Sequence, residues 1–110
     1  MKLKSVHGKV ILYSVRGAGW FSLKGADLAS QNLADANLKG ANLTGADLGF
    51  SWFNGADLTN ARLCGAKLDG AHFQGATLEG VDWTGATFSS STEWPQGFGD
   101  PTAREMKKSW

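Results

Sequence analysis

Side chains that could do chemistry are few in this 110-residue chain, and their spacing does not bring them together. Neither His7 nor His72 has a cysteine or carboxylate at a spacing that predicts a metal site or a catalytic triad. The single cysteine, Cys64, excludes an intramolecular disulfide, and its place after a large apolar residue predicts a surface thiol without a role. We therefore expect no enzyme, no catalytic residue, no cofactor and no bound metal.

Four aspartates directly precede large apolar residues and are interpreted as solvated surface groups: Asp27, Asp47, Asp57 and Asp82. The formal net charge is +1, without a long acidic or basic run. The apolar run at residues 10–13 is too short for a secretory or membrane-spanning segment. These features predict a single soluble domain in the cytoplasm, with no membrane partner.

The elements that carry these side chains are set by a five-residue period. Every fifth residue from Leu23 to Phe88 is Leu, Phe or Trp, at fourteen consecutive positions. Alanine usually stands two positions before this central residue, and glycine usually stands two positions after it. Because glycine adopts positive φ without steric cost, the pattern predicts a short extended stretch followed by a type II turn. A fixed short period indicates a fold built by stacking one unit.

Runs such as ANLKGANLTGADL at residues 36–48 resemble the pentapeptide repeat family. The resemblance covers residues 21–90 and implies an all-β fold, a right-handed, four-sided parallel β-helix with twenty residues per coil and about 3.5 coils. Residues 1–20 and 91–110 are then expected to cap the two ends of a single domain spanning 1–110. The sequence of residues 92–98 also resembles the end segments of such proteins from cyanobacteria.

Twenty residues per coil would stack the central residues in four columns, and Phe53 and Phe73 would share one of them. The predicted core consists of Leu23, Leu28, Leu33, Leu38, Leu43, Leu48, Phe53, Leu58, Leu63, Leu68, Phe73, Leu78, Trp83 and Phe88.

Both ends of the chain are non-repetitive, as a solenoid with exposed edges requires. Residues 2–15 predict a strand or a hairpin that turns near residues 7–9 and shields the first coil. Asp100 is a candidate helix N-cap, and Pro101 suits the first helical position. We expect a helix over residues 101–110, with Ala103, Met106 and Trp110 near one face, to hide Trp83 and Phe88. This end could instead form an end-to-end homodimer; a monomer is the preferred hypothesis.

The repeat pattern breaks most clearly at Phe50 to Phe53. Phe50 occupies the position that favours glycine, and because Phe resists positive φ we expect a different turn at this corner. Trp52 stands where Asp or Asn usually points to solvent, between Asn32 and His72 in its column. Exposed aromatic residues are enriched at binding hot spots. Phe50, Trp52 and His72 are therefore the candidate interaction patch, unless a terminal segment covers them.

Three functional classes remain to be compared: an interaction scaffold, a DNA mimic and a nucleic-acid-binding protein. The first is an interaction scaffold that presents rigid faces to another protein. The second, implied by the resemblance, is a mimic of duplex DNA that binds an enzyme such as DNA gyrase. Residues 21–90 carry seven acidic and four basic side chains, a net charge of −3, over a short stack. This charge and length favour the scaffold over the mimic, and the scattered basic residues argue against nucleic-acid binding.

Overall fold

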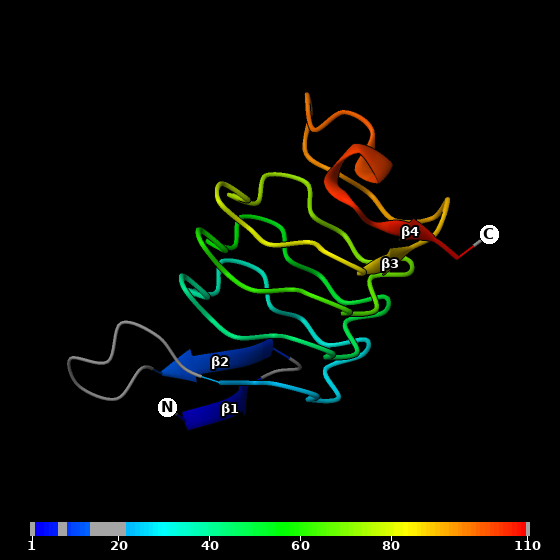
Figure 1. Cartoon of the computed structure of the whole chain (residues 1–110). Helices are drawn as coiled ribbons and strands as arrows, with labels where there is room; N and C mark the ends of the chain where they lie inside the picture. Colours follow the sequence, from blue (N-terminus) through cyan, green and yellow to red (C-terminus); the bar gives the residue numbers. More distant parts are fainter. Residues whose placement is uncertain (1, 7–8, 14–21, 110) are drawn as a thin grey trace.

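The computed structural model describes residues 2–6, 9–13 and 22–109, with side chains from residue 22 onward. The chain winds into a stack of similar turns, which climbs from the cyan to the yellow part of the ribbon (Figure 1). Successive turns are joined by parallel bridges between residues twenty apart, from Ser22↔Asn42 to Lys67↔Thr87. The five-residue period therefore forms four sides per turn of the stack.

Each repeat uses the same local structure, which residues 36–43 illustrate. Asn37 bridges to Asp57 in the next turn, and the following Leu38 N–H donates to the Asp57 carbonyl at 2.8 Å. A tight turn then brings the Ala41 N–H within 3.0 Å of the Leu38 carbonyl. Gly40 stands at this corner with φ of +71°, the conformation that the glycine pattern predicts.

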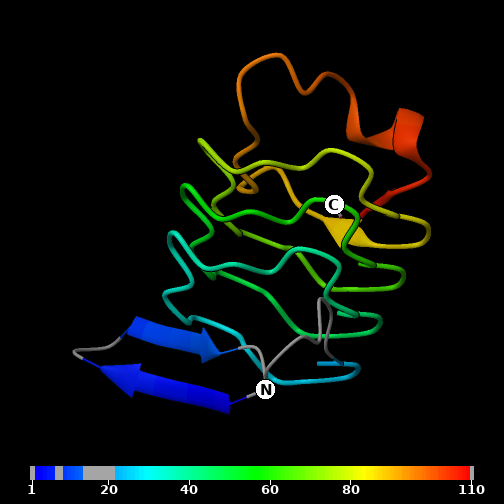
Figure 2. The ribbon, with the colours of Figure 1, turned by 90° about the vertical axis from the view of Figure 1, so that its left-hand side faces the viewer.

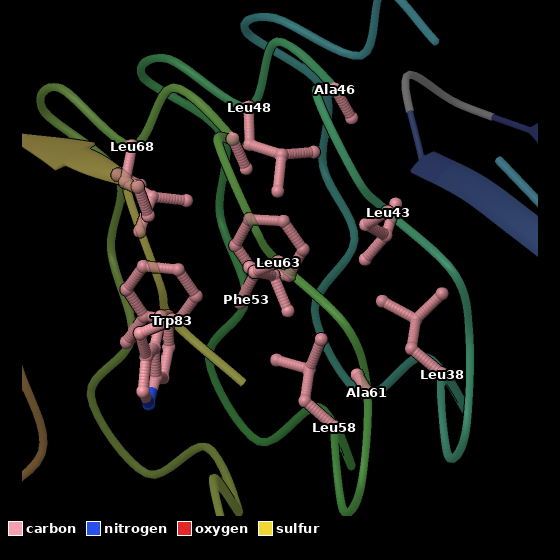
Figure 3. Close-up of a cluster of buried hydrophobic side chains, with 14 of the residues drawn as sticks. Leu38, Leu43, Ala46, Leu48, Phe53, Leu58, Ala61, Leu63, Leu68 and Trp83 are labelled. Carbon is pink, nitrogen blue, oxygen red and sulfur yellow. The ribbon is translucent and has the colours of Figure 1, made fainter. Parts of the chain in front are cut away.

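The interior of the stack is filled by the central residues and the alanines that precede them (Figure 3). Of the fourteen predicted core side chains, twelve are buried, and Leu23 and Leu78 are only partly buried. Alanines such as Ala41 and Ala61 are fully buried beside the leucines. A small side chain is needed at these positions because the sides of the stack approach each other closely. Leu38, Leu58 and their neighbours point toward the same enclosed space in Figure 3.

One core column is a continuous stack of aromatic rings. Phe53 and Phe73 stack with centroids 4.9 Å apart and an interplanar angle of 9°. Trp94 stacks on the other face of Phe73 at 5.3 Å, and Phe98 stacks on Trp94 at 4.5 Å. The Arg104 guanidinium closes the column, 3.9 Å from the centroid of the Phe98 ring. The aromatic column thus extends the core beyond the last regular repeat.

At the N-terminal end, strands β1 (Lys2–Val6) and β2 (Lys9–Tyr13) form an antiparallel hairpin, drawn in blue in Figure 2. The residues at its tip, 7–8, and the connection at 14–21 lie outside the described residues. The turn expected near residues 7–9 and the shielding of the first coil by this segment stay predictions.

At the C-terminal end the predicted helix is much shorter than expected. A 3-10 helix, η1 (Pro101–Arg104), begins with Asp100 as its N-cap and Pro101 in its first turn, and ends at Glu105 with φ of +61°. Strand β4 (Lys107–Lys108) follows and pairs in parallel with strand β3 (Thr87–Phe88). Pairing with the open edge of the last repeat, through a 2.8 Å bond from the Lys107 N–H to the Ala86 carbonyl, replaces further helical turns.

The side chains that cover the last repeat also differ from the prediction. Met106 is buried, but Ala103 is exposed, and Trp110 lies outside the described residues. Trp83 contacts the rings of Trp94 and Phe98 edge-on at 5.6 and 5.8 Å. The aromatic residues of the loop before η1, rather than the helix itself, therefore pack over Trp83. Among the described residues, no helix is long and apolar enough to cross a membrane.

Candidate interaction surface

The first residue of the candidate surface is Trp52, which lies on one side of the stack. Trp52 bridges to Asn32 in one turn and to His72 in the next, as its column predicts. Its N–H donates to the Gln31 carbonyl at 3.0 Å, and its carbonyl accepts the Leu33 N–H at 2.8 Å. With both backbone groups held in the ladder, the indole stands outward from the side and is 51% exposed.

The prediction of a different turn at the Phe50 corner is wrong. Its φ is +58°, the same left-handed conformation that glycine adopts at most of the other corners. The ladder holds this conformation, because the Phe50 N–H donates to the Asp69 carbonyl at 2.9 Å and the Ser51 N–H closes the turn onto Leu48 at 3.2 Å. The sequence rule failed here because a non-local hydrogen-bond ladder outweighs a local steric preference of about 1–2 kcal/mol.

The Phe50 ring has a fixed place on the surface. A Cβ built on Gly70, the corner residue of the next turn, would lie 2.4 Å from two ring carbons of Phe50. The absence of a side chain at Gly70 therefore makes room for the ring, which lies along the corner column and stays 62% exposed. Asp35 and Asn60 lie over Gly55 and Gly80 in the same way.

Ser51 secures the segment between the two aromatic residues from the inside. It replaces the usual alanine and is fully buried, and its hydroxyl donates to the Leu28 carbonyl at 2.5 Å. Thr92 repeats the device further along the stack, with a 2.8 Å bond to the Leu68 carbonyl. A buried hydroxyl that bonds a neighbouring turn restrains the backbone that carries Phe50 and Trp52.

His72 lies beside Trp52 and is supported by a residue that the sequence pattern did not reveal. The His72 and Trp52 rings meet edge-on, with centroids 6.0 Å apart. The His72 Nδ1 atom lies 3.4 Å from Glu93 Oε2, and the Gln74 amide donates to the same carboxylate oxygen. Glu93 escaped prediction because one extra residue places it twenty-one positions after His72 rather than twenty.

Phe50 and Trp52 are the only large hydrophobic side chains that are exposed among those the structure describes. The ladder joins the segments that carry Phe50, Trp52 and His72, and it adds Glu93 at the C-terminal side. The described part of the C-terminal segment does not cover the two aromatic rings. The surface formed by Phe50, Trp52, His72 and Glu93 is called the aromatic face below.

The aspartates that precede central residues have structural roles as turn acceptors. Asp57 Oδ1 accepts the Thr59 N–H at 3.0 Å and the Thr59 hydroxyl at 2.6 Å, and Asp82 accepts the same pair from Thr84. These bonds to the hydroxyl and to the backbone N–H lower the pKa of Asp57 and of Asp82. Their oxygen atoms stabilise turns and do not converge on a shared site.

Cys64 is half-buried rather than fully on the surface. Burial raises the pKa of its thiol, and a hydrogen bond to Asp82 raises it further. A raised pKa keeps the thiol protonated and weakly nucleophilic. His7 lies outside the described residues, and within the described part of the chain no group of three His, Cys, Asp or Glu side chains could hold a metal ion.

Comparison with known proteins places this stack in a family. The model of the pentapeptide repeats matches residues 22–60 and 56–92, with eight copies of the unit. The chain belongs to the pentapeptide repeat family, whose members form right-handed, four-sided β-helices. The family is a repeat-protein fold, and no catalytic domain is indicated.

The solved structures that resemble the chain are also pentapeptide repeat proteins. One, from the thylakoid lumen of Arabidopsis thaliana, is 33% identical with a TM-score of 0.60, over 64% of this chain and 54% of that one. Another, from the cyanobacterium Nostoc PCC 7120, is 28% identical with a TM-score of 0.47, over 79% of each chain. The chain thus spans about half the length of the Arabidopsis protein. No match was found among curated proteins.

Proposed function

We propose that this protein is a non-enzymatic interaction scaffold, and that another protein binds its aromatic face. The observation that carries the proposal is the exposure of Phe50 and Trp52, at 62% and 51%, the two exposed large hydrophobic side chains in the part of the chain that the structure describes. Large aromatic residues that remain in water favour burial against a partner, because they offer wide apolar area at a low cost in side-chain entropy.

The construction of the aromatic face supports recognition rather than catalysis. Ladder hydrogen bonds hold the backbone of Trp52 and His72, and the Glu93 carboxylate holds the His72 ring. A surface held in this way needs little ordering when a partner binds. The His72 imidazole and the Glu93 carboxylate face each other, and the four residues of the aromatic face include no hydroxyl or thiol that could act as a nucleophile. In this proposal the protein acts as a monomer.

The charges of the stack support an interaction scaffold over a mimic of duplex DNA. A mimic of duplex DNA needs a sustained line of negative groups. In the column of Asp27 and Asp47 the next two residues are Lys67 and Thr87, which interrupt the negative line. An assay of supercoiling by DNA gyrase separates the two roles, and inhibition at micromolar protein would favour the mimic.

A comparative pull-down from a lysate of the source organism tests the proposal. Trp52→Ala should reduce the recovery of the specific partner about tenfold or more, as removal of a hot-spot aromatic residue does. Lys67→Ala changes an exposed side chain on another side of the stack and should leave recovery unchanged. Both variants should keep the circular dichroism spectrum of the parent. Equal recovery of every partner by the parent and Trp52→Ala would reject the proposal.

A further inference from the structure

The last regular repeats leave part of their upper edge unpaired. Among the described residues, the N–H groups of Leu78, Gly80 and Trp83 have no hydrogen-bond acceptor, although their counterparts one turn earlier all have one. The carbonyls of Ala76 and Val81 likewise lack the donor that the ladder supplies elsewhere. Residues 76–83 therefore present the backbone groups of a strand edge along two adjoining sides, which is called the open edge below.

The open edge exists because the chain leaves the stack and returns. Glu93 still pairs with the turn below, since its carbonyl accepts the Phe73 N–H at 2.8 Å. Loop residues 95–100 then rise away from the stack, as the orange segment of Figure 1 shows. The ladder resumes at Glu105, whose carbonyl accepts the Gly85 N–H at 3.0 Å. The C-terminal segment thus completes two sides of the last turn and skips the two sides between them.

A groove lies along this open edge. Its volume is about 480 Å³, and residues 78–84 form one wall while Ala103, Arg104 and Glu105 form the other. Leu78 and Val81 are only partly buried, so the groove has apolar positions next to the unpaired backbone groups. This combination of unpaired main-chain groups and apolar positions is what strand addition of an extended peptide uses.

The charge of the groove selects the kind of peptide. Glu79, Asp82 and Glu105 line it, and all three are exposed. The one basic group in its wall is Arg104, whose guanidinium lies over the Phe98 ring. Within the stack, Arg62 is the bridge partner of Asp82 in the turn below, so a basic residue in the column of Asp82 already has a precedent.

We propose that the groove at the open edge binds an extended, lysine- or arginine-rich segment of another protein, which adds as a parallel strand over residues 76–83. In the twenty-residue register of the ladder, an apolar side chain of the segment covers Leu78. A basic side chain directly after it faces Glu79, and another one four positions after it faces Asp82. This site is separate from the aromatic face and does not rest on the function proposed for it.

Binding of a designed peptide tests this proposal. The probe is a fluorescent peptide with two copies of Ala-Lys-Leu-Lys-Gly, and its counterpart carries Ala-Asp-Leu-Asp-Gly. Fluorescence anisotropy should show saturable binding of the basic peptide only, weakened by salt. Hydrogen exchange followed by NMR should show the amides of Leu78, Gly80 and Trp83 slowed about tenfold or more by the basic peptide.

Two kinds of variant locate the binding. Glu79→Gln combined with Glu105→Gln should weaken binding about tenfold, because it removes two charges of the groove. Its matched control is Asp27→Asn combined with Asp47→Asn, which removes the same charge from another side; Asn32, Asn37 and Asn42 already accept the equivalent turn bonds. Ala103→Trp, at an exposed position of the opposite wall, should fill the groove and abolish binding.

Several results would overturn the proposal. These are no binding of the basic peptide, equal binding of the acidic peptide, binding that Ala103→Trp leaves unchanged, or binding without protection of the three amides. Sedimentation of the protein without peptide tests whether the chain associates with itself. Self-association that Ala103→Trp abolishes would make a second copy of the chain the occupant, and would exclude a basic segment of another protein.

Discussion

Phe50 has a left-handed backbone conformation, and substitutions there separate the cost of backbone strain from the contribution of side-chain packing to stability. Phe50→Ala removes the ring but leaves a Cβ at φ of +58°. A fully buried Phe side chain contributes about 1.5–3 kcal/mol, and with 62% of this one exposed roughly a third of that is lost, about 0.5–1 kcal/mol. Phe50→Ala should therefore lower the free energy of unfolding by this amount.

Phe50→Gly also removes the ring, but it relieves the backbone. The left-handed conformation costs a residue with a Cβ roughly 1–2 kcal/mol, which the greater freedom of unfolded glycine offsets only in part. We therefore expect Phe50→Gly to be about 1 kcal/mol more stable than Phe50→Ala and nearly as stable as the parent. Urea unfolding followed by circular dichroism measures the three free energies.

Gly45→Ala is the matched control for the backbone contribution to the stability difference between Phe50→Ala and Phe50→Gly. Gly45 has φ of +70°, and a Cβ built there meets nothing within 4 Å. Its substitution should destabilise the protein by about 1 kcal/mol through the backbone alone. If Phe50→Gly proved no more stable than Phe50→Ala while Gly45→Ala was destabilised, Phe50 would not occupy a left-handed corner. The Phe50 ring would then not have the position on the aromatic face that is described above.

Three further predictions concern the stack itself. Leu58→Ala should lower the free energy of unfolding in urea by about 2–5 kcal/mol, because it leaves a cavity in a fully buried column; a loss below 1 kcal/mol would contradict the buried position. Ser51→Ala should cost about 1 kcal/mol by leaving the Leu28 carbonyl without its buried donor, and an unchanged melting temperature would argue against that bond. The pKa values of Asp57 and Asp82 are lowered by folding from 3.8, so their stabilisation is present above about pH 4 and is lost as the pH falls through the folded values. Asp57→Asn should accordingly be less stable than the parent near neutral pH and should lose less of its free energy of unfolding as the pH falls through the folded pKa; an identical pH dependence of the two free energies would contradict this assignment.

If Phe50→Gly is as stable as the parent, stability alone does not explain why this corner carries Phe. Glycine, aspartate, asparagine and serine occupy the other corners between residues 25 and 85. An aromatic residue held in an unfavourable conformation and largely exposed fits a site where the repeat departs from its own rule for the sake of binding. The Phe50 cycle and the Trp52→Ala pull-down therefore examine the same surface by independent measurements.

Local pattern predicted the repeat well because each unit solves the same local problem. The five-residue period assigned the central residues, the alanines and the glycine corners correctly, since a short strand and a tight turn depend on neighbours in the chain. It also placed Trp52 beside His72, because a constant period converts positions twenty apart into spatial neighbours. Where the period held, a separation of twenty residues in the sequence identified residues that are neighbours in the structure.

Prediction failed where the period ended or where non-local bonds decided the conformation. The helix expected over residues 101–110 stops at Arg104, because Lys107 and Ser109 pair with the edge of strand β3 instead. The contact between His72 and Glu93 depends on a one-residue slip that no local signal marks. Neither feature involves residues that are close in sequence.

The amino-acid sequence by itself determined the repeating unit, its apolar column positions and its glycine corners, because these follow from steric limits and burial within a few residues. The tertiary structure decided that Phe50 turns like a glycine, that its ring lies over Gly70, and that residues 76–83 keep an open edge. These outcomes depend on which backbone groups find partners one turn away, and only the assembled stack supplies or withholds those partners.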